Sequence, residues 1–252
     1  MRNLKAAALP NLAHYLIHAH RGHTTFAVTP ALTPATFAQA MQVQAATMAG
    51  LGAKAGGWKV GFSPDGQPVA GPMLDRDIRP SGISWPLPAA GPVIVEVEIA
   101  VRLAHDLPAR LDKPYTRADI VAAIAEVLPG IELICSRLAD GAASPFTAWL
   151  ADRLGNLGYV FGPARADFHG LDLTALRCVL KLDGAVVHDR AGGHPQGDPL
   201  APLLACANQP NELRAGQIIT TGSLIVPLPC TAAMRLEAEI EGLGKVMLEL
   251  AR

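Results

Sequence analysis

The clearest alternation of hydrophobic and polar positions in the chain runs from Val93 to Val101. Neighbouring side chains of a β-strand point to opposite faces, so the valines and Ile99 share one face while Glu96 and Glu98 stand side by side on the other. Residues two apart on a strand are separated by roughly 6.5–7 Å, so both carboxylates can reach one cation. On this stretch alone, a salt bridge to a neighbouring Lys or Arg is the simpler interpretation.

Other segments show the periodicity of helices or of further strands. Helices are expected at residues 3–20, 33–50, 116–128 and 200–208, with Thr33 as the N-cap of the second and a capping box at Thr116 beginning the third. Strands and hairpins are expected at residues 58–62, 131–135, 179–187, 218–226 and 236–250. The proline-rich segment 63–92 lacks periodicity, which is typical of a lid or binding loop.

Charged residues inside apolar strands are the candidates for chemistry. Lys59, flanked by glycines, is either an edge charge or a buried amine that can exchange protons. Glu132 is a third carboxylate among aliphatic residues, and three carboxylates from two strands suit Mg²⁺ or Mn²⁺. Salt bridges remain the alternative, with Arg137 as one partner. Asp77 by default pairs with a neighbouring arginine.

Composition narrows the classes of function. The 252 residues are 50% hydrophobic and 17% charged, which predicts a compact globular protein. A formal net charge of −1 makes nucleic acid an unfavourable partner. Neither a signal peptide nor an apolar stretch long enough to cross a bilayer is evident, so no membrane association and a cytoplasmic location are expected. The four cysteines are widely spaced and show no zinc motif. The histidines near the first helix, among them His20, are expected on a solvated face.

Five motifs together resemble the 2-keto-4-pentenoate hydratase family of the fumarylacetoacetate hydrolase superfamily. They stand in that family's order and spacing, and the resemblance covers nearly the whole chain. The motifs are Gly57-Trp58-Lys59-Val60-Gly61, Leu74 with Asp77-Ile78, Val95-Glu96-Val97-Glu98-Ile99-Ala100, Pro129-Gly130-Ile131-Glu132-Leu133 with Ser136-Arg137, and Ala215 through Leu224.

The resemblance implies an α+β fold that is mostly β. We expect a mixed β-roll or sandwich with peripheral helices, like the C-terminal domain of fumarylacetoacetate hydrolase. An N-terminal helical segment, residues 1–56, is expected to pack on a catalytic β-rich domain, residues 57–252. The family likeness also implies a homo-oligomer.

The resemblance further implies a site and an activity. Glu96, Glu98 and Glu132 are expected to hold Mg²⁺ or Mn²⁺, and Lys59 and Asp77 to be catalytic. Arg137, Gly222 and Ser223 are expected to bind substrate, because no nucleophile elbow surrounds Ser223. The implied reaction is hydration of a small 2-hydroxy-2,4-dienoate to a 4-hydroxy-2-oxo acid, as in meta-cleavage catabolism of aromatic compounds.

Three alternatives stay open at this point. Within the superfamily, a 4-oxalocrotonate-type decarboxylase and an acylpyruvate C–C hydrolase use related metal chemistry, and a non-catalytic binding protein could keep the same fold. The sequence also departs from the family pattern near the pocket. Cys135 stands where an acidic residue is usual, Arg153 where asparagine is usual, and Thr231 within a Pro-Cys-Thr that replaces Pro-Gly-Asp. We expect these departures to alter substrate choice.

Overall fold

The computed structural model describes residues 3–89, 91–110 and 112–252, with side chains from Asn11 onward. The helices are α1 (Asn3–Gly22), α2 (Phe37–Gly50), α3 (Arg117–Ala123), α4 (Phe146–Ala151) and α5 (Ala201–Ala207), with short 3-10 helices η1 (Asp75–Asp77), η2 (Gly141–Ala143) and η3 (Arg153–Gly155). The strands are β1 (Ala55–Phe62), β2 (Pro68–Leu74), β3 (Ile78–Pro80), β4 (Ile83–Pro86), β5 (Val93–Leu103), β6 (Ile124–Ile134), β7 (Asn156–Phe161), β8 (Arg177–Leu182), β9 (Ala185–Ala191), β10 (Ile218–Ser223), β11 (Leu228–Cys230), β12 (Met234–Ile240) and β13 (Gly244–Ala251).

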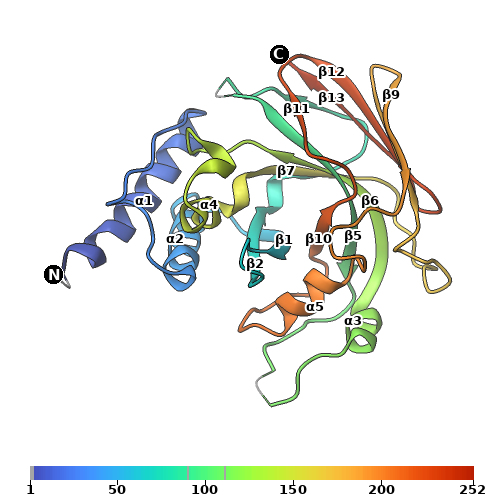
Figure 1. Ribbon diagram of the computed structural model, residues 1–252, viewed down its shortest axis with the longest axis horizontal. Coiled ribbons are helices and arrows are strands. Elements are labelled where there is room, and N and C mark those ends of the chain that lie inside the picture. Colours follow the sequence, from blue (N-terminus) through green and yellow to red (C-terminus); the bar gives the residue numbers. More distant parts are fainter. Residues whose placement is uncertain (1–2, 90, 111) are drawn as a thin grey trace.

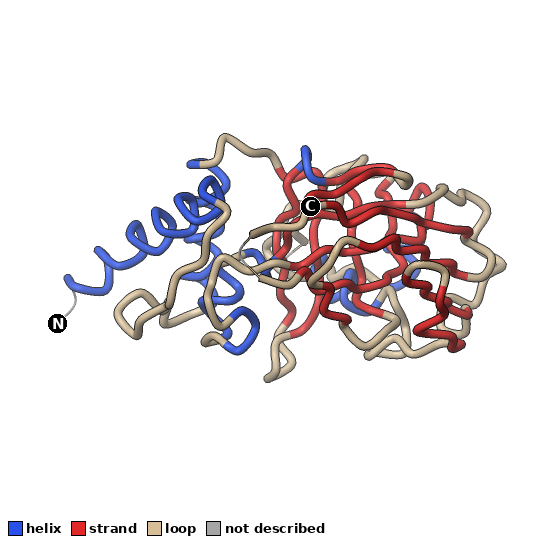
Figure 2. The backbone as a smooth tube through the Cα atoms, turned by 90° about the horizontal axis from the view of Figure 1, so that it is seen from above, coloured by secondary structure: helices blue, strands red, loops and turns tan. Residues whose placement is uncertain are grey.

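Two sheets form the body of the molecule. The first has the order β2-β1-β10-β5-β6-β7-β3, with β11 beside β5, and the second has the order β4-β13-β12-β8-β9. Within the first sheet, β1 runs parallel to β10, with Gly57 opposite Ile218. The strands gather in one half of the molecule and α1 and α2 lie in the other (Figures 1 and 2). The expected mostly-β α+β fold with mixed sheets is confirmed.

The alternation seen from Val93 to Val101 creates the core. Side chains at the odd positions of β5 are fully buried and belong to one apolar cluster with residues of the second sheet, among them Leu236 and Leu248. The even face of β5, with Glu96 and Glu98, is therefore turned away from this inter-sheet core. A hairpin between β8 and β9 turns at Asp183 and Gly184, both with positive φ, as expected from the sequence.

The prediction for residues 63–92 was wrong, because β2, β3 and β4 lie within this segment. β2 pairs with β1, β3 with β7, and β4 with β13, so the segment contributes to both sheets. Its prolines are tolerated because they stand at strand ends, as Pro68, Pro80 and Pro86 do, or in the edge strand β2, as Pro72 does.

Two helix boundaries also differ from the prediction. The N-cap of α2 is Thr36, whose Oγ1 accepts a hydrogen bond from Gln39 N at 3.2 Å, and not Thr33. The capping box at Thr116 is present, but α3 ends at Ala123 and residues 124–134 form β6. Pairing with β5 along its whole length outweighs the helical spacing of Ile124, Val127 and Leu128.

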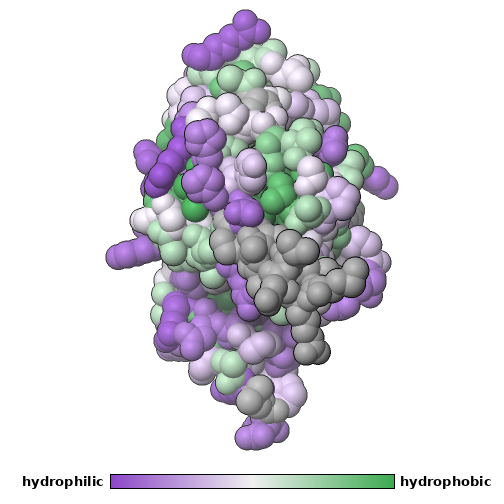
Figure 3. Space-filling view, turned by 90° about the vertical axis from the view of Figure 1, so that its left-hand side faces the viewer, coloured by the Kyte–Doolittle hydropathy of each residue, from purple (hydrophilic) through white to green (hydrophobic). Residues whose placement is uncertain are grey.

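The helix α1 is continuous through Pro10. It shares a second apolar cluster with α2 and with the body of the molecule, in which Leu12 and Val43 meet Val69 and Leu150. The division at residue 56 stays a prediction. On the face that these helices present, hydrophilic and hydrophobic side chains are mixed (Figure 3). No helix within the described residues is long and apolar enough to span a membrane.

Candidate metal centre and active site

Three glutamates meet where β5 and β6 pair. Glu96 lies directly opposite Glu132 in the antiparallel register, and Glu98 lies opposite Gly130. A ligand oxygen from each of the three carboxylates lies within 4.8 Å of the others. Glu98 and Glu132 are fully buried, whereas the Glu96 side chain is 15% exposed. The structure therefore brings the three predicted metal ligands together.

Lys59 reaches this cluster from β1. Its Nζ lies 3.0 Å from Glu96 Oε2 and 3.2 Å from Glu132 Oε1. Burial alone would lower the pKa of Lys59, but the charges of Glu132, Glu96 and Glu98 outweigh it and raise the pKa above its usual value. The ammonium is therefore charged at neutral pH. Its single positive charge against three carboxylates leaves two negative charges to be balanced.

The residues fit a hard divalent cation. Among the described residues, both oxygens of Glu98 and Oε2 of Glu132 are buried without a hydrogen-bond partner. Burial raises the pKa of Glu98 well above its usual value, and the charges of Glu132 and Glu96 add to the rise. Oxygen ligands of this kind are those that Mg²⁺ and Mn²⁺ prefer. A divalent ion would supply the missing partner and balance the two excess charges.

The buried carboxylates predict how stability depends on pH without metal. Burial raises the pKa of both Glu98 and Glu132, so the folded state binds more protons than the unfolded chain above their usual pKa of 4.5. We therefore expect this pair to make the free energy of unfolding fall as pH rises from about 4.5 through the folded pKa values. Added Mg²⁺ should reverse the fall, because it binds the charged carboxylates.

Melting temperatures measured across pH in EDTA and in Mg²⁺ would check this prediction. The variant Glu98→Gln isolates the contribution of the site from that of other titrating groups, and its metal-free melting temperature should depend less on pH. Equal pH dependence in the variant and the native protein would contradict it.

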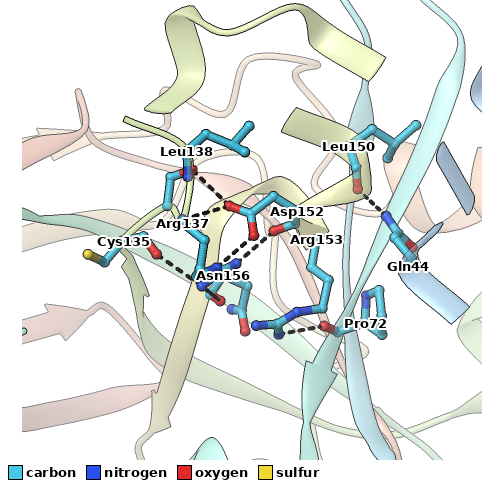
Figure 4. Close-up of polar contacts among 10 residues, drawn as sticks. Gln44, Pro72, Cys135, Arg137, Leu138, Leu150, Asp152, Arg153 and Asn156 are labelled. Carbon is cyan, nitrogen blue, oxygen red and sulfur yellow. Dashed lines mark hydrogen bonds and ion pairs between the residues drawn. The ribbon is translucent and has the colours of Figure 1, made fainter. Parts of the chain in front are cut away.

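A buried polar network supports Glu132 from behind. Asn156 Nδ2 donates a hydrogen bond to Glu132 Oε1 at 3.0 Å. The Arg137 guanidinium donates to Asp152 Oδ1 at 2.6 Å and to the backbone oxygens of Asn156, Cys135 and Asp152 (Figure 4). Sequence reasoning missed Asn156, although an amide directly before an apolar strand was a usable signal. The sequence left open that Arg137 pairs with one of the glutamates, but Arg137 pairs with Asp152 instead.

A cavity of about 780 Å³ opens at the glutamate cluster. Lys59, Glu96 and Glu98 form its polar end together with Gly222 and Ser223. Much of the remaining wall is apolar, and its larger side chains are Phe62, Val69, Ile94, Ile134, Leu138, Phe146, Trp149 and Leu154. The cavity therefore suits a small molecule with one anionic end and an apolar body.

Gly222 and Ser223 end β10 where its pairing with β5 is irregular, just before a bend at Leu224 and Ile225. Gly222 has a φ of +117°, and a Cβ there would lie 3.1 Å from His194 Nε2. His194 Nε2 lies 2.8 Å from Thr221 O, so it donates to that carbonyl and holds this end of β10. The Ser223 hydroxyl donates to Ile225 O at 2.9 Å. Substrate contacts from Gly222 and Ser223 stay predictions.

Asp77 and Arg137 do not join the glutamate cluster. Both line a second cavity of about 860 Å³, whereas neither lines the cavity at Lys59. Lys59 Nζ forms its ion pairs with Glu96 and Glu132, so the structure shows no contact through which Asp77 would orient it. The Arg137 guanidinium is already bonded to the protein. The catalytic role of Asp77 and the substrate-binding role of Arg137 therefore stay predictions.

Comparison with known proteins gives the family. Residues 34–250 match the family described as fumarylacetoacetate (FAA) hydrolase C-terminal. The chain is 35% identical over 171 residues to a 2-keto-4-pentenoate hydratase of Paraburkholderia phymatum, covering 66% of this chain and 64% of that one. It is 32% identical over 184 residues to a 2-keto-4-pentenoate hydratase of Burkholderia vietnamiensis, covering 71% and 69%. These matches span about two thirds of the length of either relative.

Among solved structures, a 4-oxalocrotonate decarboxylase from Pseudomonas putida G7, complexed with magnesium and adipate, is similar with a TM-score of 0.85. That protein is 26% identical, and the match covers 99% of each chain. The match to the family covers residues 34–250, which include the three-glutamate cluster and, up to Leu250, both sheets. The chain therefore belongs to the fumarylacetoacetate hydrolase C-terminal family.

Proposed function

We propose that the protein is a divalent-metal-dependent hydratase. It would add water to a 2-hydroxy-2,4-dienoate of the 2-oxopent-4-enoate type and give a 4-hydroxy-2-oxo acid, as in meta-cleavage catabolism of aromatic compounds. The observation that carries this proposal is the carboxylate cluster with Lys59 at the polar end of a largely apolar cavity. The relatives named 2-keto-4-pentenoate hydratase support it.

Glu96, Glu98 and Glu132 would hold Mg²⁺ or Mn²⁺ at this polar end. Bound there, the metal would supply Lewis-acid stabilisation of the negative charge that develops on the C2 oxygen of the substrate. The substrate offers its carboxylate and this adjacent oxygen, both hard donors. Glu96 is the ligand that faces the cavity, with its side chain 15% exposed.

Lys59 is the proposed proton donor and anion partner. Its raised pKa keeps it charged, so it carries a proton and can hold the anionic end of the substrate. Protonation of the dienol at its far carbon, C5, gives the conjugated 2-oxo-3-enoate. Water then adds, its hydroxyl to C4 and its hydrogen to C3, so one water molecule is consumed. The apolar wall limits access of other water to the tail.

A second candidate is a 4-oxalocrotonate-type decarboxylase, favoured by the similarity to the solved decarboxylase. Such a substrate carries a second carboxylate at its far end. Lys59 is the only Lys or Arg among the described residues that line the cavity. A distal carboxylate would therefore lie against apolar side chains such as Phe146 and Trp149, at a cost in desolvation. The cavity thus favours hydration of an uncharged tail.

Three substrates separate the candidate reactions. With Mg²⁺, we expect 2-hydroxypentadienoate to lose its dienol absorbance without release of CO₂. Oxalocrotonate and acetylpyruvate, tested in parallel, should turn over more slowly, by at least about tenfold. Faster CO₂ release from oxalocrotonate would favour the decarboxylase, and faster C–C cleavage of acetylpyruvate would favour the hydrolase. Absence of Mg²⁺ or Mn²⁺ binding would favour a non-catalytic role.

We also propose that the enzyme is a cytoplasmic homo-oligomer, as the family resemblance implies. Sedimentation of the purified protein as a monomer would contradict this proposal.

A further inference from the structure

The second cavity is strongly cationic. Four arginines line its wall, namely Arg21, Arg76, Arg79 and Arg137, and Asp77 is its one carboxylate among the described lining residues. Arg76 Nε lies 4.0 Å from Asp77 Oδ2, and Arg137 is paired with Asp152. Positive charge therefore remains in excess on this wall, and the mechanism proposed above does not use it.

A buried arginine adds to this excess from behind the wall. Arg153 is 2% exposed, and its one hydrogen bond among the described residues is to Pro72 O at 3.3 Å. Its guanidinium forms no ion pair within the described part of the chain, although that of Arg137 does (Figure 4). Burial, and then the charge of Arg137, lower the pKa of Arg153 to about 9. The charges of Asp152 and Asp77 offset this only in part, because neither carboxylate forms an ion pair with Arg153.

His20 shows that these charges converge on the cavity. His20 was expected on a solvated face, but it is half-buried and lines the cavity. Its Nε2 lies 3.4 Å from Arg76 Nη2. Burial, and then the charges of Arg153, Arg137 and Arg76 in that order, together lower the pKa of His20 to about 3. Three guanidinium groups thus act on one point of the wall, where an anion would be stabilised.

Two departures from the family pattern fall at this wall. Cys135, where an acidic residue is usual, lines the cavity, and Arg153, where asparagine is usual, lies behind it. The first removes a negative charge and the second adds a positive one. The rest of the wall is apolar and includes Trp85, Leu87 and Leu157.

We propose that this second cavity is a binding site for a small organic carboxylate, distinct from the cavity at the candidate metal centre, with which it shares the lining residues Cys135 and Ser136. The acid group would be held by Arg76 and Arg79, with Arg153 contributing charge from behind, and the apolar body would lie against Trp85 and Leu157. Guanidinium groups bind carboxylates through paired hydrogen bonds, and Arg76 and Arg79 are both exposed and so accessible to a ligand.

Calorimetric titration with benzoate at low salt tests the proposal, on protein stripped of metal with EDTA and then dialysed free of EDTA, which is itself a carboxylate. We expect one benzoate per chain to bind, at concentrations below about 10 mM. Benzyl alcohol, matched in shape but uncharged, should not bind, and inorganic phosphate should bind more weakly. Binding should weaken as ionic strength rises. Absence of benzoate binding, or equal binding of benzyl alcohol, would overturn the proposal. Tighter binding of phosphate would instead assign the site to inorganic anions and reject the organic ligand.

Variants locate the binding. Arg79 is exposed, so the variant Arg79→Gln should fold normally. Arg79→Gln and Arg153→Gln should each weaken benzoate binding by about tenfold or more. Arg153→Gln should not lower the melting temperature, because it removes a buried cation whose charge is offset only in part. Arg177→Gln, an exposed arginine paired with Asp189, is the matched control and should bind normally. Lys59→Met should also bind normally, and loss of binding there would place benzoate at the metal-centre cavity and refute the proposal.

Discussion

Replacing Glu98 with glutamine is expected to abolish metal-dependent turnover while leaving the fold intact. Glu98 is fully buried, and its two oxygens have no hydrogen-bond partner among the described residues. Glutamine keeps the shape but removes the charge that a hard cation requires. We expect kcat/KM to fall by at least about 100-fold and metal affinity to fall with it. Metal affinity should be measured by calorimetry alongside the Mg²⁺ dependence of the rate.

Glu126→Gln is the matched control for this variant. Glu126 lies on β6 like Glu132, but it pairs with Arg102 at 2.7 Å and its side chain is 25% exposed. We expect metal affinity and turnover of the control to remain near the native values. If Glu98→Gln kept full metal-dependent activity, the assignment of the ligands would be wrong.

Lys59→Met is expected to lower kcat by about 10²–10⁴-fold, the usual contribution of a positioned acid or base. Lys59 is the only ammonium at the cavity among the described residues, and methionine retains much of its length without the charge. Metal affinity should remain or rise, because a positive charge 3.0 Å from Glu96 is removed. Steady-state kinetics together with metal titration would therefore distinguish loss of the proton donor from loss of the metal.

Lys181→Met provides the control for the second variant. Lys181 lies on β8, its side chain is 36% exposed and pairs with Glu237 at 3.8 Å, and it is not among the residues that line the cavity. Its loss should leave kcat unchanged. A native kcat in Lys59→Met would show that Lys59 takes no part in the reaction. If kcat and metal affinity both fell, Lys59 would instead be needed to hold the site in shape.

The carboxylate site could be anticipated from sequence because its information is local. Alternation along β5 fixes which side chains share a face, and Glu132 lies on the neighbouring strand. The sequence could not show which cation forms ion pairs with the glutamates, because both Lys59 and Arg137 were candidates. The placement of β1 relative to β6 decides that Lys59 pairs with Glu132.

The two errors in the predicted secondary structure have the same origin. Residues 124–128 have helical spacing but form part of β6, because they pair with β5. Within residues 63–92, three segments form strands because they pair with β1, β7 and β13. Asp77, which the family resemblance groups with Lys59, lies on η1 and lines the second cavity, and its catalytic role stays a prediction. The two errors concern strand pairing, which local patterns do not encode, whereas the misplaced N-cap of α2 is a local error of three residues.

The parallel pairing of β1 with β10 has a consequence for how the protein acquires its site. The two strands are far apart in the chain, and Lys59 lies opposite Thr220. Joining them closes a long loop, and folding slows when such non-local contacts dominate the topology. The three carboxylates on adjacent β5 and β6 can therefore come together early, whereas the ammonium that partly neutralises them is fixed only when the distant strand docks.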